Sequence, residues 1–225
     1  MTRPLLFVVL SYLWGAIPAS YIAGRLARGI DLRRHGSGNL GATNTFRVLG
    51  AKVAAPVMVF DILKGFFPVY LFYHRGLGWD GSGDWRWGLA YGAAAIVGHV
   101  FSIYMGFKGG KGVATSAGVF LALAPLAVGV GLLTWLIVLR TTRMVSAGSV
   151  SAALVVMAML LLPFSRVPAE VKILGSAVCL FVIFAHRENI KRILNGTESR
   201  FGSGKQPDAE TVGAAAVTAD AEEPT

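Results

Sequence analysis

Four short polar segments carry most of the side chains that could bind a charged ligand in this otherwise apolar chain. The first, GSGNLGATNTFR, combines glycines with hydroxyl groups, amides and one arginine. Glycine lets a backbone approach a ligand closely, successive N–H groups can point at an anion, and a guanidinium fork suits phosphate. Composition alone fits a flexible surface loop equally well. As phosphate ligands this segment offers Ser37, Asn39, Thr43, Asn44 and Arg47.

The second segment, GHVFSIYMGFKGGKGVAT, places two lysines around two glycines directly before an apolar run. Backbone N–H groups at a helix start, together with Lys108 and Lys111, would form an anion site. The segment is not a Walker A loop, because its glycine spacing is one residue short and Gly112 replaces the serine or threonine. An ordinary basic loop at a membrane surface is the alternative.

Two further segments repeat a spacing of three between polar residues, which places both on one face of a helix. In RMVSAGSVSAA these residues are Ser146 and Ser149, and in HRENIKRILNGTE they are His186 and Asn189. Small residues that allow close helix packing explain the first pair as well. A basic helix that lies on anionic lipid headgroups explains the second.

Asp61 and Lys64 are also three residues apart, but they lie inside an apolar run. Charged side chains in a membrane helix are costly and usually pair with each other or line a site. We expect an internal ion pair that supports the core. A single histidine in such a run, His99, is more typical of a structural hydrogen bond than of catalysis.

The composition indicates which elements must position these groups. Hydrophobic residues make up 54% of the chain and charged residues 15%, against about 25% charged residues in a typical soluble domain. Apolar runs of about 20 residues can cross a bilayer as helices. The sequence therefore predicts an all-α polytopic membrane protein. Its candidate spans are Leu5–Gly24, Val53–Tyr73, Trp87–Phe107, Gly112–Leu139, Val145–Pro163 and Val167–Ala185.

The run Gly112–Leu139 is long enough for one tilted helix, but Pro125 in its middle favours two segments. Charge asymmetry distinguishes the two readings. With two segments, fifteen lysines and arginines fall on one side of the membrane and five on the other, whereas one segment gives ten on each. Because basic residues prefer the cytoplasmic side, we expect seven transmembrane helices, the N-terminus outside and the C-terminus in the cytoplasm. Two full spans and a re-entrant hairpin give the same sidedness.

The end of the chain differs from the rest in composition. Residues 205–225 contain five acidic residues, one lysine and no aromatic residue, and are typical of a disordered acidic tail rich in alanine. Residues 1–204 form the predicted membrane domain and carry a net charge of +13. The topology places most of this charge, and all four polar segments, at the cytoplasmic surface.

This convergence predicts a site for a phosphorylated substrate at the inner membrane surface, with membrane lipids as neighbours. We expect no metal, no cofactor and no nucleic-acid partner. A transporter for organic phosphates would also need a basic, glycine-rich site, but such folds often contain repeats and a midplane site. The chain shows no repeat, and its polar segments gather at one end. A non-catalytic lipid-binding scaffold does not explain four separate polar segments.

The four segments, in this order and spacing, resemble the bacterial acyl-phosphate:glycerol-3-phosphate acyltransferase family, PlsY. The intervening FDILKGFFPVY is also similar, and the resemblance covers about residues 5–202. It implies a seven-helix enzyme of the bacterial inner membrane with its active site facing the cytoplasm. Such an enzyme moves a fatty acyl group from acyl phosphate to the 1-hydroxyl of glycerol 3-phosphate, which yields lysophosphatidic acid and phosphate. The family does not use acyl-CoA or acyl carrier protein as direct donor.

The resemblance also implies roles for individual residues. The residues expected to take part in catalysis are His186, Asn189, Lys111 and Ser149. The residues expected to bind substrate phosphate are Ser37, Asn39, Thr43, Asn44, Arg47, Lys108 and Ser146. Acyl phosphate is a mixed anhydride with a good leaving group, so we expect charge neutralisation and positioning to dominate catalysis. The sequence contains no set of residues that requires a covalent acyl-enzyme.

Overall fold

The computed structural model describes residues 2–74, 86–163 and 165–201, and every regular element in these ranges is helical. The elements are α1 (Thr2–Ala16), α2 (Ala19–Arg28), η1 (Leu32–Arg34), α3 (Ala42–Leu49), α4 (Ala51–Phe67), η2 (Pro68–His74), α5 (Arg86–Val100), η3 (Ile103–Met105), α6 (Val113–Leu123), α7 (Pro125–Thr142), α8 (Val145–Leu161), α9 (Ala169–Ala185) and α10 (Arg187–Leu194). The predicted tail, residues 205–225, lies outside the described residues.

The long helices are apolar enough to cross a membrane. Within the described ranges four segments qualify by length and composition, and a fifth does if α9 and α10, bent by 54° at their junction, count as one span. The four are Arg3–Arg28, Ala51–Phe72, Arg86–Met105 and Pro125–Thr142. Helices α6 and α8 are apolar but shorter. An all-α membrane protein is thus confirmed, and each of the seven predicted segments contains an apolar helix. The number of full spans stays a prediction.

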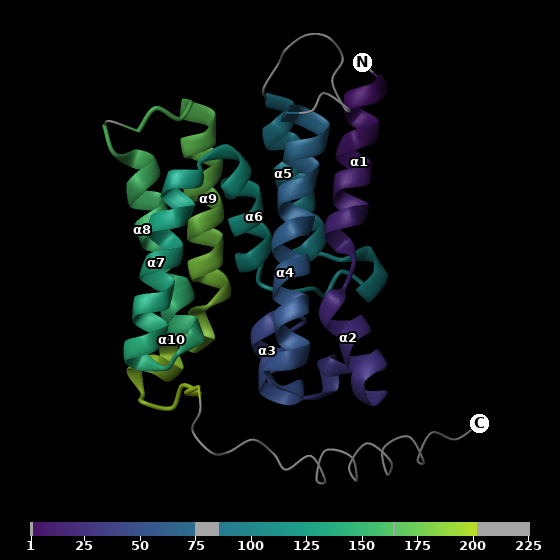
Figure 1. Ribbon diagram of the computed structural model, residues 1–225, viewed down its shortest axis with the longest axis vertical. Coiled ribbons are helices and arrows are strands. Elements are labelled where there is room, and N and C mark those ends of the chain that lie inside the picture. The colour runs from purple at the N-terminus through teal and green to yellow at the C-terminus, as the bar shows by residue number, and fades with distance from the viewer. Residues whose placement is uncertain (1, 75–85, 164, 202–225) are drawn as a thin grey trace, which may run out of the picture.

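Helix α6 joins two groups of helices (Figure 1). On one side α1 packs on α5 and α4 packs on α6, and on the other α7, α8 and α9 pack together. α6 contacts α4 and α5 as well as α7 and α9. The short helices α2, α3 and α10 lie at the end of the bundle opposite the N-terminus (Figure 1). The first and fourth polar segments, which these helices carry, therefore share one end of the molecule.

The run Gly112–Leu139 forms two helices that are separated at Pro125, and not one tilted helix. α6 stops at Leu123 and α7 begins at Pro125, with Ala124 in a non-helical conformation between them. Proline lacks the N–H that would continue the first helix, but its fixed φ suits the first turn of the second. The predicted break is confirmed. With eleven residues, α6 is about 16 Å long and does not cross a hydrocarbon core of about 30 Å by itself.

Close contact between α4 and α6 depends on glycine. A Cβ on Gly65 would lie 2.0 Å from the carbonyl oxygen of Thr115, and one on Gly118 would lie 1.9 Å from that of Ile62. Small residues at membrane helix interfaces allow the backbones to approach in this way. The contact fixes the start of α6, where the second polar segment ends, against the C-terminal part of α4.

Candidate active site

The first polar segment is a loop whose shape is set by Asn44. Its Oδ1 accepts a hydrogen bond from the backbone N–H of Ser37 at 2.8 Å, and its Nδ2 donates to the carbonyl oxygens of His35 at 3.0 Å and Leu32 at 3.3 Å. The side chain is 2% exposed. The sequence presents Asn44 as a phosphate ligand, whereas in the structure its amide is occupied by the loop. Thr43 is exposed at the start of α3.

The first and second segments meet at an open pocket of about 520 Å³. It is lined by Asp31, Arg33, Arg34, Ser37, Gly38, Asn39, Lys108 and Gly109. Three of the predicted ligands, one of them from a different segment, therefore share one cavity. Three basic side chains against one carboxylate make the pocket suited to an anion.

Arg33 and Asp31 in this pocket form a tight ion pair. Arg33 Nη2 lies 2.6 Å from Asp31 Oδ2, and Arg33 Nε also donates to both carboxylate oxygens. The hydrogen bonds from Arg33 hold the pKa of Asp31 below its ordinary value. Because this pair is neutral overall, the net positive charge of the pocket comes from Arg34 and Lys108.

A second cluster joins the other three segments through Lys111. Its Nζ donates a short hydrogen bond to Oδ1 of Asn189 on α10. Asn189 Nδ2 donates to Oε1 of Glu198 at 2.7 Å, and Ser146 Oγ on α8 donates to the same oxygen at 2.7 Å. Arg192 Nε lies 2.7 Å from Glu198 Oε2. The structure thus brings together three predicted residues from three different segments.

Sequence reasoning missed two members of this cluster, Arg192 and its partner Glu198. Glu198 is 7% exposed and has a partner at both carboxylate oxygens. Burial opposes ionisation, but the hydrogen bonds from Ser146, Asn189 and Arg192 outweigh it and lower the pKa of Glu198. The only feature of the sequence that points to Glu198 as a site residue is its position at the end of the fourth segment. It lies nine residues after Asn189 and beyond the end of α10.

Several positive charges surround Lys111. Burial lowers the pKa of its amine, Arg192 lowers it further, Glu198 raises it, and Arg47 and Arg187 add smaller decreases. Arg47 on α3 is half-buried. Because its charge lowers the pKa of Lys111, Arg47 and Lys111, which come from different segments, lie within electrostatic range of each other. Adjacent cations form a natural site for a phosphate group.

His186 lies at the bend between α9 and α10 and is 5% exposed. Its Nδ1 is 2.7 Å from the carbonyl oxygen of Val182, so Nδ1 carries the proton and Nε2 is left as an acceptor. Burial first, and then the charge of Lys111, lower the pKa of His186 to about 4. The imidazole is neutral at pH 7. Ser149, 5% exposed, donates to the carbonyl oxygen of Val145 at 3.0 Å.

Known proteins share this sequence and fold. The family model described as "Glycerol-3-phosphate acyltransferase" matches residues 5–196. The glycerol-3-phosphate acyltransferase of Geobacter sulfurreducens is 42% identical over 201 residues, which cover 89% of this chain and 99% of the relative. That of Fusobacterium nucleatum is 41% identical over 199 residues, covering 87% and 96%.

Two crystal structures of PlsY (YgiH), an integral membrane glycerol 3-phosphate acyltransferase, have the same fold. The glycerol 3-phosphate form superposes with a TM-score of 0.79 at 38% identity, and the lysophosphatidic acid form with 0.77 at 36%. Each alignment covers 89% of this chain and 96% of the solved chain. The resemblance indicated by the four segments is confirmed. The chain therefore belongs to the glycerol-3-phosphate acyltransferase family.

Proposed function

We propose that this protein transfers a fatty acyl group from acyl phosphate to the 1-hydroxyl of glycerol 3-phosphate, with lysophosphatidic acid and inorganic phosphate as products. One observation carries the proposal. The hydrogen-bonded cluster of Lys111, Asn189, Glu198 and Ser146 lies next to a neutral histidine, His186, whose Nε2 can accept a proton. Cations for phosphate and a base for a hydroxyl are the two requirements of this reaction.

Two phosphorylated substrates repel each other, so the site must neutralise both. The open pocket with Lys108 and the cluster around Lys111 offer two adjacent basic regions on one short loop. Arg47 adds a guanidinium near Lys111 that can bind phosphate in a bidentate manner. Ser37 and Asn39 line the pocket and are proposed as neutral ligands of the same phosphate as Lys108.

The reaction is a direct transfer. The 1-hydroxyl oxygen attacks the acyl carbonyl carbon, a C–O ester bond forms, and the C–O bond to phosphate breaks. Inorganic phosphate leaves with the electron pair, and the hydroxyl proton passes to Nε2 of His186 or to the departing phosphate. Because phosphate is a good leaving group, no covalent acyl-enzyme is required. Positioning and electrostatic stabilisation supply most of the rate enhancement.

Several residues of the site act on their neighbours. Glu198 accepts a hydrogen bond from Nδ2 of Asn189, which turns Oδ1 of the same amide toward Lys111 and fixes the amine. Asn44 holds the first loop in shape. Ser149 donates to its own helix, so we propose a direct role for it only if a substrate exchanges that bond. Thr43, exposed on α3, is proposed as a peripheral phosphate contact.

The proposed location follows from chemistry and charge. Acyl chains are insoluble in water, and a membrane bundle lets the chain stay among lipids while its phosphate enters the pocket. The excess of basic residues around the four segments supports a site at the cytoplasmic face of the bacterial inner membrane. We propose that residues 205–225 are dispensable, so that a chain ending at Gly204 keeps its activity.

The test uses purified protein in detergent with palmitoyl phosphate, with and without glycerol 3-phosphate. We expect phosphate release that depends on glycerol 3-phosphate and equals the amount of lysophosphatidic acid detected by mass spectrometry. Palmitoyl-CoA should not replace the acyl phosphate. Because detergent micelles have no second compartment, turnover also excludes a transporter. Phosphate release without lysophosphatidic acid, or equal use of palmitoyl-CoA, would contradict the proposal.

A further inference from the structure

Two charged side chains of α4 are buried in the bundle and take no part in the proposed chemistry. Lys64 is 1% exposed and Asp61 is 2% exposed, and Lys64 Nζ lies 2.7 Å from Asp61 Oδ1. Replacement of a buried ion pair by neutral groups of similar volume is often neutral or even stabilising. Stability alone is therefore a weak reason for charges at this place, and the groups that they contact are more informative.

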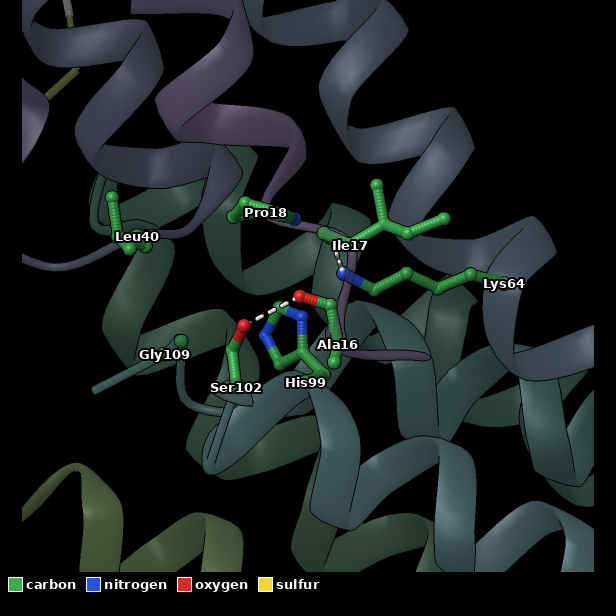
Figure 2. Close-up of a pocket in the computed structure, with 9 residues that line it drawn as sticks. Ala16, Ile17, Pro18, Leu40, Lys64, His99, Ser102 and Gly109 are labelled. Carbon is green, nitrogen blue, oxygen red and sulfur yellow. Dashed lines mark hydrogen bonds between the residues drawn. The ribbon is translucent and has the colours of Figure 1, made fainter. Parts of the chain in front are cut away.

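Lys64 holds the break between α1 and α2. Its Nζ donates to the carbonyl oxygen of Ile17 at 2.9 Å, and Ser102 Oγ donates to that of Ala16 at 2.6 Å (Figure 2). Carbonyl groups freed by a helix break inside a membrane protein need such partners. α2 leaves this break and leads directly into the loop of the first polar segment. The direction of that loop thus depends on a side chain of α4.

Asp61 faces the second polar segment through His99. His99 Nδ1 lies 3.7 Å from Asp61 Oδ1. The imidazole lies directly against Gly110, where a Cβ would come within 2.2 Å of His99 Nε2 and 2.9 Å of the carbonyl oxygen of Leu40. The N–H of Gly110 also donates to the carbonyl oxygen of His99 at 3.1 Å. Gly110, in the loop of the second polar segment (the second loop), therefore packs between His99 and Leu40. Leu40 belongs to the loop of the first polar segment (the first loop).

Figure 2 shows Lys64, His99, Leu40, Ser102 and the helix break around one small cavity of about 10 Å³. Its lining includes the helix break, Lys64, His99, Leu40 and Gly110, so both phosphate loops meet Lys64 at a single point, and Asp61 contacts two of the lining residues, Lys64 and His99. We propose that Asp61 and Lys64 are positioning residues that fix the first loop relative to the second loop. The proposal rests on the proposed function, in which the two loops must hold two phosphates at a reactive distance. Misplacement of reacting groups by about 1 Å can cost about 10²-fold in rate.

The variants that test this are Lys64→Met and the double variant Asp61→Asn/Lys64→Met, which removes both charges and nearly keeps the volumes. Lys172→Met, a half-buried lysine at the start of α9, is the matched control. We expect the double variant to unfold within a few degrees of the wild type, yet to show kcat/KM for acyl transfer lower by about 10²-fold at equal folded protein. The control should keep its full activity. Recovery of wild-type kcat/KM in the double variant overturns the proposal, because the pair then serves stability alone.

A distance measurement separates this inference from the proposed function. Nitroxide labels at Leu26 on α2 and Phe107 in the second loop, both exposed, report the relative position of the loops in a Cys179→Ala background. We expect a narrow distance distribution that broadens or shifts in the double variant. An unchanged distribution overturns the positioning role. If the wild type transfers no acyl group, the proposed function fails, while the label distances still decide whether the pair positions the loops.

Discussion

Replacement of Arg47 by alanine should lower kcat/KM for acyl transfer by about 10²-fold and leave the thermal unfolding midpoint nearly unchanged. Among the described residues the half-buried guanidinium has no side-chain hydrogen bond or ion pair, so its removal leaves no partner unsatisfied. A hydrogen bond to a charged group contributes about 1.5–3 kcal/mol, which corresponds to about 10- to 10²-fold. The proposed bidentate contact of Arg47 with a phosphate beside Lys111 corresponds to the upper end of this range.

Two further variants sharpen the test. Arg47→Lys keeps the charge but loses the planar fork, so it should recover only a small part of the lost activity. Arg28→Ala removes an exposed arginine of α2 that faces neither the pocket nor the cluster, and its kcat/KM should change by less than about threefold.

The assay is phosphate release by each variant over a range of both substrates, at equal amounts of folded protein. If the Arg28 and Arg47 variants lose activity together, general surface charge is responsible and the idea of a specific phosphate ligand is wrong. If the Arg47 variant is fully active while His186→Ala is inactive, proton transfer dominates and the electrostatic argument fails.

Reporters fused at residues 80 and 205 should be external and cytoplasmic, respectively, because basic residues are concentrated on one side; the same side for both would contradict the topology. Gly110→Ala should lower kcat/KM at least about tenfold, since its Cβ would lie 2.2 Å from His99 Nε2, whereas Gly129→Ala, with open space around it, should not. The pKa of His186 is about 4 in the fold against 6.5 ordinarily, so between these values the unfolded chain binds a proton that the folded chain does not. Stability in detergent should therefore fall as the pH drops from about 6.5 to about 4, and His186→Gln should reduce that slope.

The sequence was informative where the physical cause is local or additive. The break at Pro125 follows from a missing N–H, which no tertiary contact can replace within one helix. The apolar runs predict helices because an unpaired backbone group in lipid is costly at any position. The sequence places its glycine-rich loops and most of its basic residues on one side of the membrane, so we expect their polar side chains to lie close together. The structure places three of these residues on one pocket: Ser37, Asn39 and Lys108.

Other features depend on contacts between residues that are remote in the chain. Lys111 and Asn189 are 78 positions apart, and only the packing of α6 and α10 against α9 brings the amine to the amide. Asn44 has the composition of a ligand, yet its backbone partners become available only when the loop is folded, and they occupy it. The type of a side chain determines which hydrogen bonds it can form, but only the fold determines which partner it forms them with.

Glu198 and Lys64 show most clearly that the sequence does not reveal a side chain's partners. In the sequence one is an acid beyond the end of a basic helix, and the other is one half of an ion pair on a single helical face. The fold adds partners from elsewhere in the chain: Ser146 for the carboxylate, and the carbonyl oxygen of Ile17 for the amine. The sequence by itself determined the membrane class, the break at Pro125 and the residues able to bind phosphate. The tertiary structure alone decided which of them meet, because a hydrogen bond requires its two atoms within about 3 Å and only packing of distant helices sets that distance.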